Sequence, residues 1–294
     1  MTEFLQQLVN GITVGSIYAL IALGYTMVYG ILMFINFAHG EIYMAGAFIG
    51  WYLMVQLGMP FLVATPLTVL AVACLGMTIE KIAYRPLRHA SRLGPLITAI
   101  GVSIFLQNLA AAVFGTDPRP FPLPAFLERN IYEVGGVILD SLQIWIFLLS
   151  IIIMICLDLY VNHTRMGKAM RATKINKQVA PLMGINLDTV ISLVFAIGSG
   201  IAALGGIMVG LYYNSVSPTM GFMPGLVAFT AAVLGGIGNI RGAMIGGMLI
   251  GILENLGAGY ISSGFKQGIA FFVLIALLLF RQEGIMGKVE REKV

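Results

Sequence analysis

The sequence predicts an all-α fold, a polytopic membrane bundle of about 8–10 transmembrane helices forming a single domain over residues 1–294. The first observation is composition, since 59% of the 294 residues are hydrophobic and only 10% are charged. The second is a mean hydropathy of +0.93. A soluble domain carries roughly a quarter charged residues, so this balance excludes a conventional soluble enzyme, a disordered chain and a disulfide-stapled secreted domain.

The third observation is that apolar runs long enough to cross a bilayer recur along the chain. A spanning helix needs roughly 20 mostly apolar residues, because lipid offers the backbone no hydrogen-bond partners. The runs predict about nine crossings. They cover residues 5–33, 42–58, 61–79, 96–114, 137–160, 187–213, 225–240, 243–261 and 268–280.

The connecting segments differ sharply in charge. Most of the 17 Lys and Arg residues fall in segments 80–94 and 161–186 and in the tail after residue 280. The positive-inside rule places all three in the cytoplasm. Segment 115–136, with three acidic residues and several prolines, is expected outside. Consistent alternation puts the N-terminus outside, unless residues 36–41 are a break within one discontinuous helix.

An amide, an imidazole and a carboxylate interrupt the first apolar stretch in Asn36-Phe-Ala-His39-Gly-Glu41. At membrane depth such groups are costly and would face a protein interior or a wet cavity, as a substrate, gating or proton-path site. Alternatively they form a short interfacial loop in which Asn36 and Glu41 cap the next helix. The sequence alone leaves both interpretations open. No further histidine lies near enough to suggest a metal site.

Glu254 is the second polar signal, because segment 243–261 carries no other charge. A buried carboxylate needs a partner, and we favour a structural role between helices over direct substrate contact. Glycines four residues apart, such as Gly11 with Gly15 and Gly247 with Gly251, predict close helix packing. The glycine-rich stretch 235–238 is either a re-entrant piece around a path or a turn at the cytoplasmic face.

Segment 161–186 is too long to be a simple connector. It is basic, yet Met166, Met170 and Val179 recur at about helical spacing, which predicts a short amphipathic cytoplasmic helix. Attraction to anionic lipid is one interpretation of this helix. A docking surface for a cytoplasmic partner is the other.

Motifs for nucleotide, metal or serine chemistry are missing from the sequence. We therefore expect no enzyme activity, no cofactor and no metal on this chain, and nothing points to nucleic acid. A self-sufficient channel or secondary transporter is a competing function, because it would also need helix breaks and an intramembrane carboxylate such as Glu254.

Several stretches, taken in order, resemble the branched-chain amino acid ABC permeases, and the LivH-type subunit in particular. The most specific is Asn-Phe-Ala-His-Gly-Glu at residues 36–41. Others are Asn-Gly and Gly-Ser-Ile-Tyr-Ala-Leu within 10–20, Met-Gly-Lys-Ala-Met-Arg-Ala at 166–172, Met-Gly-Ile-Asn at 183–186, and the glycine-rich stretches within 228–238 and 242–254. The resemblance covers nearly the whole chain.

This resemblance implies an importer in the bacterial inner membrane. The chain would pair with a second homologous permease, two cytoplasmic ATPases that bind the ATP, and a periplasmic binding protein. Branched-chain amino acids are the implied substrates, although relatives carry urea, short amides and other amino acids. We expect the substrate path, between the two permeases, to include Asn36, His39, Glu41 and Glu254, because these groups are polar at apparent membrane depth. The implied ATPase-coupling residues are Arg165, Met166, Gly167, Lys168, Arg171, Ala172 and Gly184.

Overall fold

A computed structural model describes residues 1–88, 91, 93–124, 126–127, 129–281 and 283–287. Its ten α-helices in the described residues are α1 (Thr2–Leu32), α2 (His39–Val55), α3 (Phe61–Ile79), α4 (Leu93–Phe114), α5 (Ser141–His163), α6 (Arg165–Ile175), α7 (Leu187–Tyr213), α8 (Phe222–Gly235), α9 (Ile240–Tyr260) and α10 (Lys266–Phe280). Short helical turns are η1 (Glu80–Tyr84), η2 (Arg85–Leu87), η3 (Ala180–Met183) and η4 (Ser263–Phe265). The strands are β1 (Arg119–Pro120), β2 (Ile131–Val134), β3 (Val137–Asp140) and β4 (Ser215–Val216).

The predicted helical membrane bundle is confirmed. Each predicted apolar run corresponds to one helix, and α6 is the predicted amphipathic helix. Among the described residues, 7 helices are long and apolar enough to cross a membrane. The other two apolar helices are short, with 17 residues in α2 and 14 in α8. At 1.5 Å per residue they extend about 25 Å and about 21 Å, less than the roughly 30 Å hydrocarbon core.

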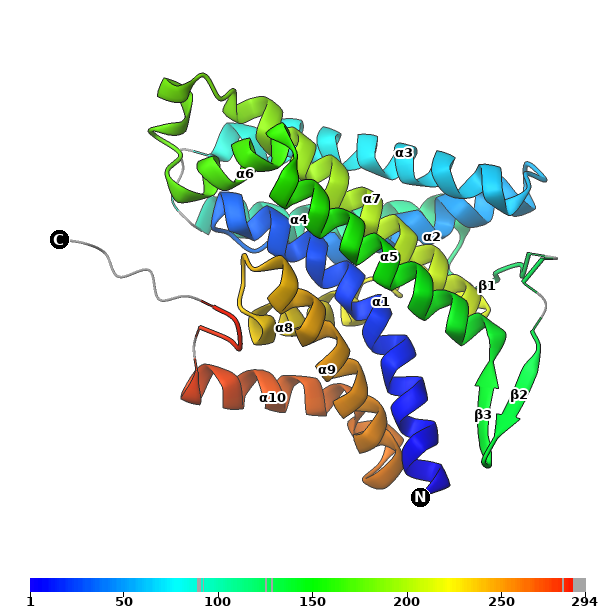
Figure 1. The fold of residues 1–294 in the computed structure, drawn as a ribbon. Helices are drawn as coiled ribbons and strands as arrows, with labels where there is room; N and C mark the ends of the chain where they lie inside the picture. Colours follow the sequence, from blue (N-terminus) through cyan, green and yellow to red (C-terminus); the bar gives the residue numbers. More distant parts are fainter. Residues whose placement is uncertain (89–90, 92, 125, 128, 282, 288–294) are drawn as a thin grey trace.

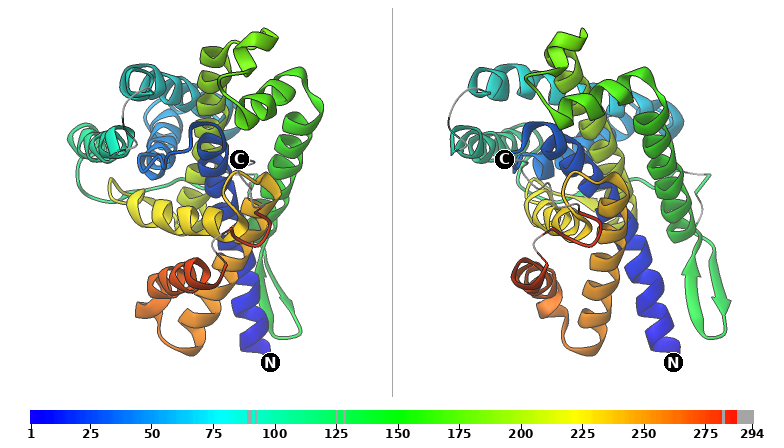
Figure 2. Two further views of the ribbon diagram at one scale, coloured as in Figure 1. Left: turned by 90° about the vertical axis from the view of Figure 1, so that its left-hand side faces the viewer. Right: turned by 60° about the vertical axis from the view of Figure 1, so that its left-hand side comes forward.

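Helix α1 lies at the centre of the bundle, with α5, α7, α8 and α9 packed around it (Figures 1 and 2). It is buried almost without interruption from Gly11 to Ile31, as expected for a helix that is apolar on every side. Helices α3, α4, α5 and α10 instead leave large apolar side chains exposed. Their outer faces are therefore available to lipid or to other membrane subunits.

The described parts of the three basic segments meet at one end of the bundle, which we call the basic end. The contacts that join them are Arg88 with Asp188, the Lys174 ammonium with the Gly238 carbonyl, and the Met286 amide with the Gly235 carbonyl. This grouping agrees with the predicted alternation of loops. Arg92 and residues 288–294 lie outside the described residues.

The predicted crossing at 137–160 begins too early. Residues 137–140 form strand β3, which pairs with β2 in an antiparallel hairpin. Gly135 and Gly136 both have positive φ, the backbone that a two-residue hairpin turn requires. Helix α5 starts only at Ser141, because Asp140 caps it in a reciprocal capping box with Gln143. The hairpin lies beside the start of α1, where Gln6 exchanges two hydrogen bonds with the Ile138 backbone.

Glycines allow α1 and α9 to approach closely, as their spacing predicts. A Cβ added to Gly15 would lie 2.9 Å from the Cα and carbonyl oxygen of Met248. A Cβ added to Gly11 would lie 2.7 Å from the Cα of Ile252. These neighbours are backbone atoms, so they cannot rotate away, and the two helices would have to separate.

The substitution Gly15→Ala tests this packing. It should lower the thermal unfolding midpoint of the detergent-solubilised protein by about 5 °C or more, because α1 and α9 lose contact. Gly101→Ala in α4 is the matched control, since an added Cβ there meets nothing within 4 Å. The control should be neutral or slightly stabilising, because alanine favours a helix. Equal midpoints for the two variants would contradict the packing argument.

Candidate functional site

The polar cluster at residues 36–41 lies at a break between two helices, buried inside the protein. Helix α1 ends at Leu32, the capping residue Met33 has a left-handed φ of 61°, and α2 begins at His39. The relative exposures of Asn36, His39 and Glu41 are 2%, 1% and 1%. An exposed interfacial loop is therefore wrong, and the break is enclosed by neighbouring helices.

His39 occupies space that Gly24 leaves free on α1. A Cβ at Gly24 would overlap the imidazole ring. The same glycine faces Gly198 near the middle of α7, which places His39 within the bundle and away from either end. The ring of Tyr25 meets the imidazole edge-on with centroids 4.8 Å apart. Within the described residues, His39 Nε2 has no hydrogen-bond partner.

Asn36 attaches the break to the end of α3. Its Oδ1 accepts hydrogen bonds from the Tyr84 hydroxyl at 2.6 Å and from the Ala38 amide at 3.2 Å. Tyr84 is buried in η1, a π-helical turn that continues α3. Asn36 Nδ2 finds no partner in the described part of the chain. The side-chain amide is thus fixed through its oxygen, while its NH₂ group makes no hydrogen bond within the described residues.

Glu41 lies where the first turns of α2 and α8 meet. A Cβ on Gly221, the residue before α8, would lie 2.5 Å from Glu41 Oε2 and 2.6 Å from the Gly40 carbonyl oxygen. Ser103 of α4 donates a 3.4 Å hydrogen bond to Oε1, whereas Oε2 has no partner among the described residues. Unpaired backbone N–H groups make a helix N-terminus favourable for negative charge. Two short helices that begin against each other inside a bundle are typical of transport paths.

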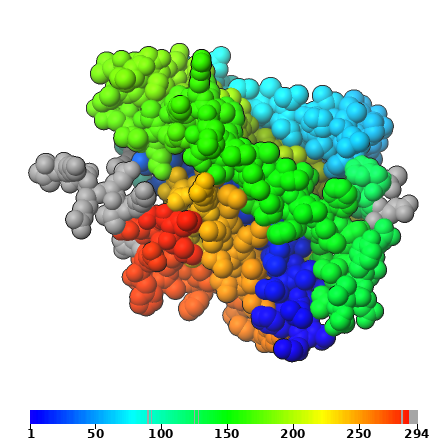
Figure 3. Space-filling model, in the orientation of Figure 1, coloured from blue at the N-terminus to red at the C-terminus, as the bar shows by residue number. Residues whose placement is uncertain are grey.

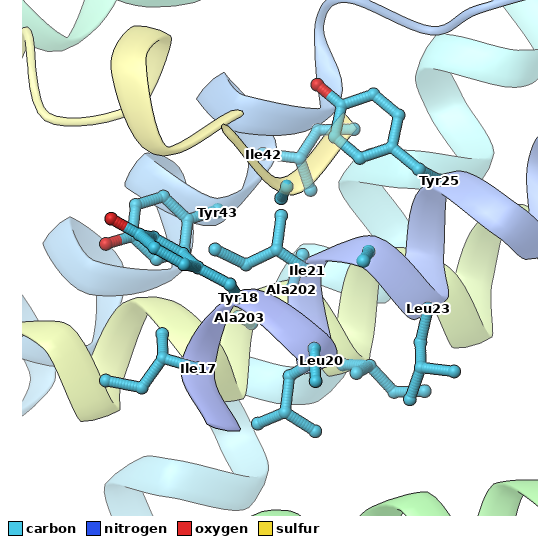
Figure 4. Packing of buried hydrophobic residues seen from close by; sticks show 14 of the residues in the cluster. Ile17, Tyr18, Leu20, Ile21, Leu23, Tyr25, Ile42, Tyr43, Ala202 and Ala203 are labelled. Carbon is cyan, nitrogen blue, oxygen red and sulfur yellow. The ribbon is translucent and has the colours of Figure 1, made fainter. Parts of the chain in front are cut away.

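Glu254 lies at a different level of the bundle. It contacts α1 at Tyr18, whereas His39 contacts α1 at Gly24, and these two α1 residues are about 9 Å apart along the helix axis. The Tyr18 hydroxyl donates to its Oε2 at 3.0 Å, and Oε1 has no partner in the described residues. Tyr18 and Tyr43 direct their hydroxyls to the same side of the core, away from Tyr25 (Figure 4). The structure therefore gathers Asn36, His39 and Glu41 and separates Glu254 from them.

The predicted coupling residues divide into two groups at the basic end. Gly167 and Arg171 attach α6 to α5. Gly167 donates to the capping Thr164 hydroxyl at 2.9 Å and leaves no space for a side chain against the Val161 carbonyl. Arg171 Nη1 donates to the Val161 and Asn162 carbonyls at 2.6 and 2.9 Å. The remaining residues are outward-facing or half-buried: Arg165, Lys168 and Gly184 are exposed, and Met166 and Ala172 are intermediate.

Sequence reasoning missed most of an exposed apolar surface beside α6. We call Ile175, Val179, Leu182 and Met183 the distal face, with relative exposures of 83%, 47%, 82% and 77%. Val179 was predicted to share a helix face with Met166 and Met170, but α6 ends at Ile175, so Val179 lies beyond the helix. The segment that carries this face stands out at one end of the molecule (Figure 3). The signal in the sequence is apolar residues inside a basic connector that lies outside the predicted spans.

An ion-pair network at the end of α3 was also missed. Arg88 pairs with both Glu80 and Asp188, and Ser192 donates to Glu80 Oε2 at 2.6 Å. Glu80 is fully buried. The network joins α3 to the start of α7, directly after the segment that carries the distal face. The sequence showed only a basic loop, because no spacing rule pairs residues this far apart in the chain.

Comparison with known proteins gives one consistent result. A family model described as "Branched-chain amino acid transport system / permease component" matches residues 7–280. The permease protein BraD of a high-affinity branched-chain amino acid transport system in Pseudomonas aeruginosa is 46% identical, over 99% of this chain and 98% of that protein. The corresponding LivH protein of Escherichia coli K12 is 44% identical over the same shares. A probable LivH protein of Methanocaldococcus jannaschii is 29% identical over 95% of this chain and 91% of that protein.

Tyr18→Phe tests whether Glu254 depends on its single hydrogen bond. Removing the donor leaves a buried carboxyl group with no partner, which costs about 1–3 kcal/mol in the free energy of unfolding. Tyr52→Phe, which alters an exposed tyrosine on α2, is the control and should change little. Denaturant unfolding of the two variants measures the difference. A Tyr18→Phe protein as stable as the control would show that Glu254 does not need Tyr18.

Proposed function

Since the chain belongs to the branched-chain amino acid transport permease family, we propose that it forms half of the translocation path of an ATP-driven importer. The observation that carries the proposal is the enclosed helix break at Asn36, His39 and Glu41 together with an exposed cytoplasmic segment at the basic end. The apolar helices long enough to cross a bilayer, together with the similarity to the LivH and BraD permeases, support a multi-pass location in the inner membrane. Its own role is passage of substrate, and ATP hydrolysis belongs to partner subunits.

The proposed path passes the junction of α2 and α8. Three buried polar atoms there lack partners in the described residues, namely Asn36 Nδ2, His39 Nε2 and Glu41 Oε2. An amino acid carries a positive and a negative charge. The Glu41 carboxylate suits the ammonium group of the substrate, and the N-termini of α2 and α8 suit its carboxylate. Because α2 and α8 are short, each can tilt about its buried end without the movement of a helix that spans the whole membrane. Glu254 stabilises the wall of the path through Tyr18.

The proposed ATPase contact combines the distal face with the exposed Arg165 and Lys168 in the first turns of α6. Exposed apolar side chains next to exposed cations are typical of a protein interface with a hydrophobic core and a polar rim. Movement of α6 reaches α5 through Arg171 and reaches the turn between α8 and α9 through the Lys174 hydrogen bond to Gly238, 2.8 Å long. Nucleotide-driven closure of two ATPases would thus move the inner ends of these helices.

The remaining proposed partners are a second, homologous permease, the surrounding lipid and a periplasmic binding protein. The permease would pack on one of the exposed apolar faces of α3, α4, α5 or α10. The binding protein would dock at the end that carries the β2–β3 hairpin. The substrate is a branched-chain amino acid, with urea, amides or other amino acids as the second candidate. A secondary transporter explains the buried carboxylates and leaves the distal face without a role.

Leu182→Ser tests ATPase docking. Because it removes an exposed apolar side chain from the distal face, we expect at least a fivefold loss of ATPase subunits recovered with the tagged permease. Ile131→Ser on strand β2 is the matched control, since Ile131 is 71% exposed at the opposite end. Quantitative mass spectrometry of the purified complexes gives the ratio. Equal recovery from the two variants argues against this docking surface.

Asn36→Ala and His39→Ala test the path. Each should lower leucine uptake into proteoliposomes at least tenfold in an assembled complex, because the polar lining at the helix break is lost. ATPase stimulation by the substrate-loaded binding protein is measured in parallel. The control is Asn108→Ala, which alters an exposed residue on α4. Normal uptake and stimulation in both path variants would remove these residues from the path.

A further inference from the structure

A cavity of about 850 Å³ opens at the basic end between α1, α5, α6 and the turn joining α8 to α9. Its volume falls in the range of small-molecule sites. The cavity does not include Asn36, His39 or Glu41 in its lining, so it is separate from the proposed path junction. One wall is α6, the helix attached to the proposed ATPase contact.

The charged side of the cavity has spare hydrogen-bond donors. Asp158 and Arg241 already satisfy each other, with Arg241 donating at 3.1 and 3.0 Å. Arg171 engages only Nη1 with the end of α5, and Lys174 donates one of its three ammonium protons to Gly238. In the part of the chain that the structure describes, these two cations thus line the cavity without a carboxylate of their own. This arrangement suits a ligand carboxylate.

The cavity also has apolar lining residues. Met27, Ile31, Met170 and Val194 line it and suit a branched aliphatic side chain. Thr26 lies among them, only 1% exposed, and its hydroxyl has no partner among the described residues. A buried unpartnered hydroxyl is costly, and a polar ligand group would satisfy it.

We propose that this cavity binds the transported branched-chain amino acid from the cytoplasmic side and thereby slows further import. The inference rests on the proposed function, which supplies both the cytoplasmic side and the substrate class. A ligand bound between α6 and α1 resists the movement of α6 that the ATPases drive. By linkage, a movement of α6 that lowers the affinity of the cavity for the ligand is opposed by bound ligand to the same extent.

Two other occupants fit part of the cavity. An inorganic anion would pair with Lys174 and Arg171. A lipid phosphate would pair with the same two residues, but its acyl chains would also require an opening from the cavity to the bilayer. Neither uses the apolar lining residues and the Thr26 hydroxyl together. A small carboxylate with a branched apolar side chain uses both, and the importer itself delivers that molecule to this side.

The test uses the complex of both permeases and both ATPases in nanodiscs, without the binding protein, so that leucine bound by that protein does not contribute; the cavity variants separate binding in the cavity from binding in the proposed path. Equilibrium dialysis with radiolabelled leucine should show saturable binding that valine and isoleucine displace. Lys174→Met, which keeps the aliphatic stem, should weaken binding at least tenfold. Thr26→Val, which keeps the shape of the side chain, should weaken it at least threefold. Lys177→Met is the matched control, because Lys177 is in the same segment and does not line the cavity.

A second measurement follows uptake into proteoliposomes preloaded with leucine, with the loaded binding protein outside. Internal leucine should slow initial uptake, relative to empty vesicles, at least threefold in the wild-type complex and in Lys177→Met, and much less in Thr26→Val, which keeps the Lys174 hydrogen bond to Gly238. Several outcomes overturn the inference: no saturable binding, equal binding by all variants, or displacement by inorganic phosphate as effective as by valine. Absence of uptake even from empty vesicles would instead count against the proposed function, and dialysis would still decide the inference.

Discussion

The absence of hydrogen-bond partners in lipid constrains this structure more than any other interaction. A helix that stops inside a membrane exposes backbone groups, so a break can persist only where protein encloses it. The break at Asn36–Glu41 meets this condition because α1, α3, α7 and α8 surround it. Glycines make the enclosure possible, since Gly24 accommodates His39 and Gly40 accommodates the start of α8. The polar cluster is therefore enclosed only because glycines let these helix backbones pack closely.

The basic end has a different logic, in which ordinary polar contacts link one small helix to several large ones. Arg171 joins α6 to α5, and Lys174 joins it to the α8–α9 turn. The Glu80–Arg88–Asp188 network then secures α3 to α7 just beyond the distal face. A force applied to α6 is thus shared by several spans. The same helix also forms one wall of the cavity, so the proposed coupling and the proposed ligand site share Arg171 and Lys174.

Much of the fold was predictable, because long apolar runs indicate membrane-spanning helices and basic segments indicate which connections lie on the same side of the membrane. The hairpin at 131–140 was not, since Val137, Ile138 and Leu139 resemble the start of a span until Gly135-Gly136 is interpreted as a turn. At the candidate site the sequence identified Asn36, His39 and Glu41 but left their depth open. It could not show that Gly221 and Gly225 of a distant segment enclose them. The ion pair of Arg88 with Asp188 depends on the same kind of long-range contact.

The central position of α1 also has a consequence for how the protein is made. Its most intimate neighbour is α9, and Ser16 and Met248 in contact across that interface are 232 residues apart. Because α1 leaves the ribosome before α9, it must reside in the membrane without its final neighbour until the residues between the two helices have been synthesised. Throughout that interval the small residues that will pack against α9 face lipid or the insertion machinery. Assembly of the bundle is thus completed only when α9 covers the glycine face of α1.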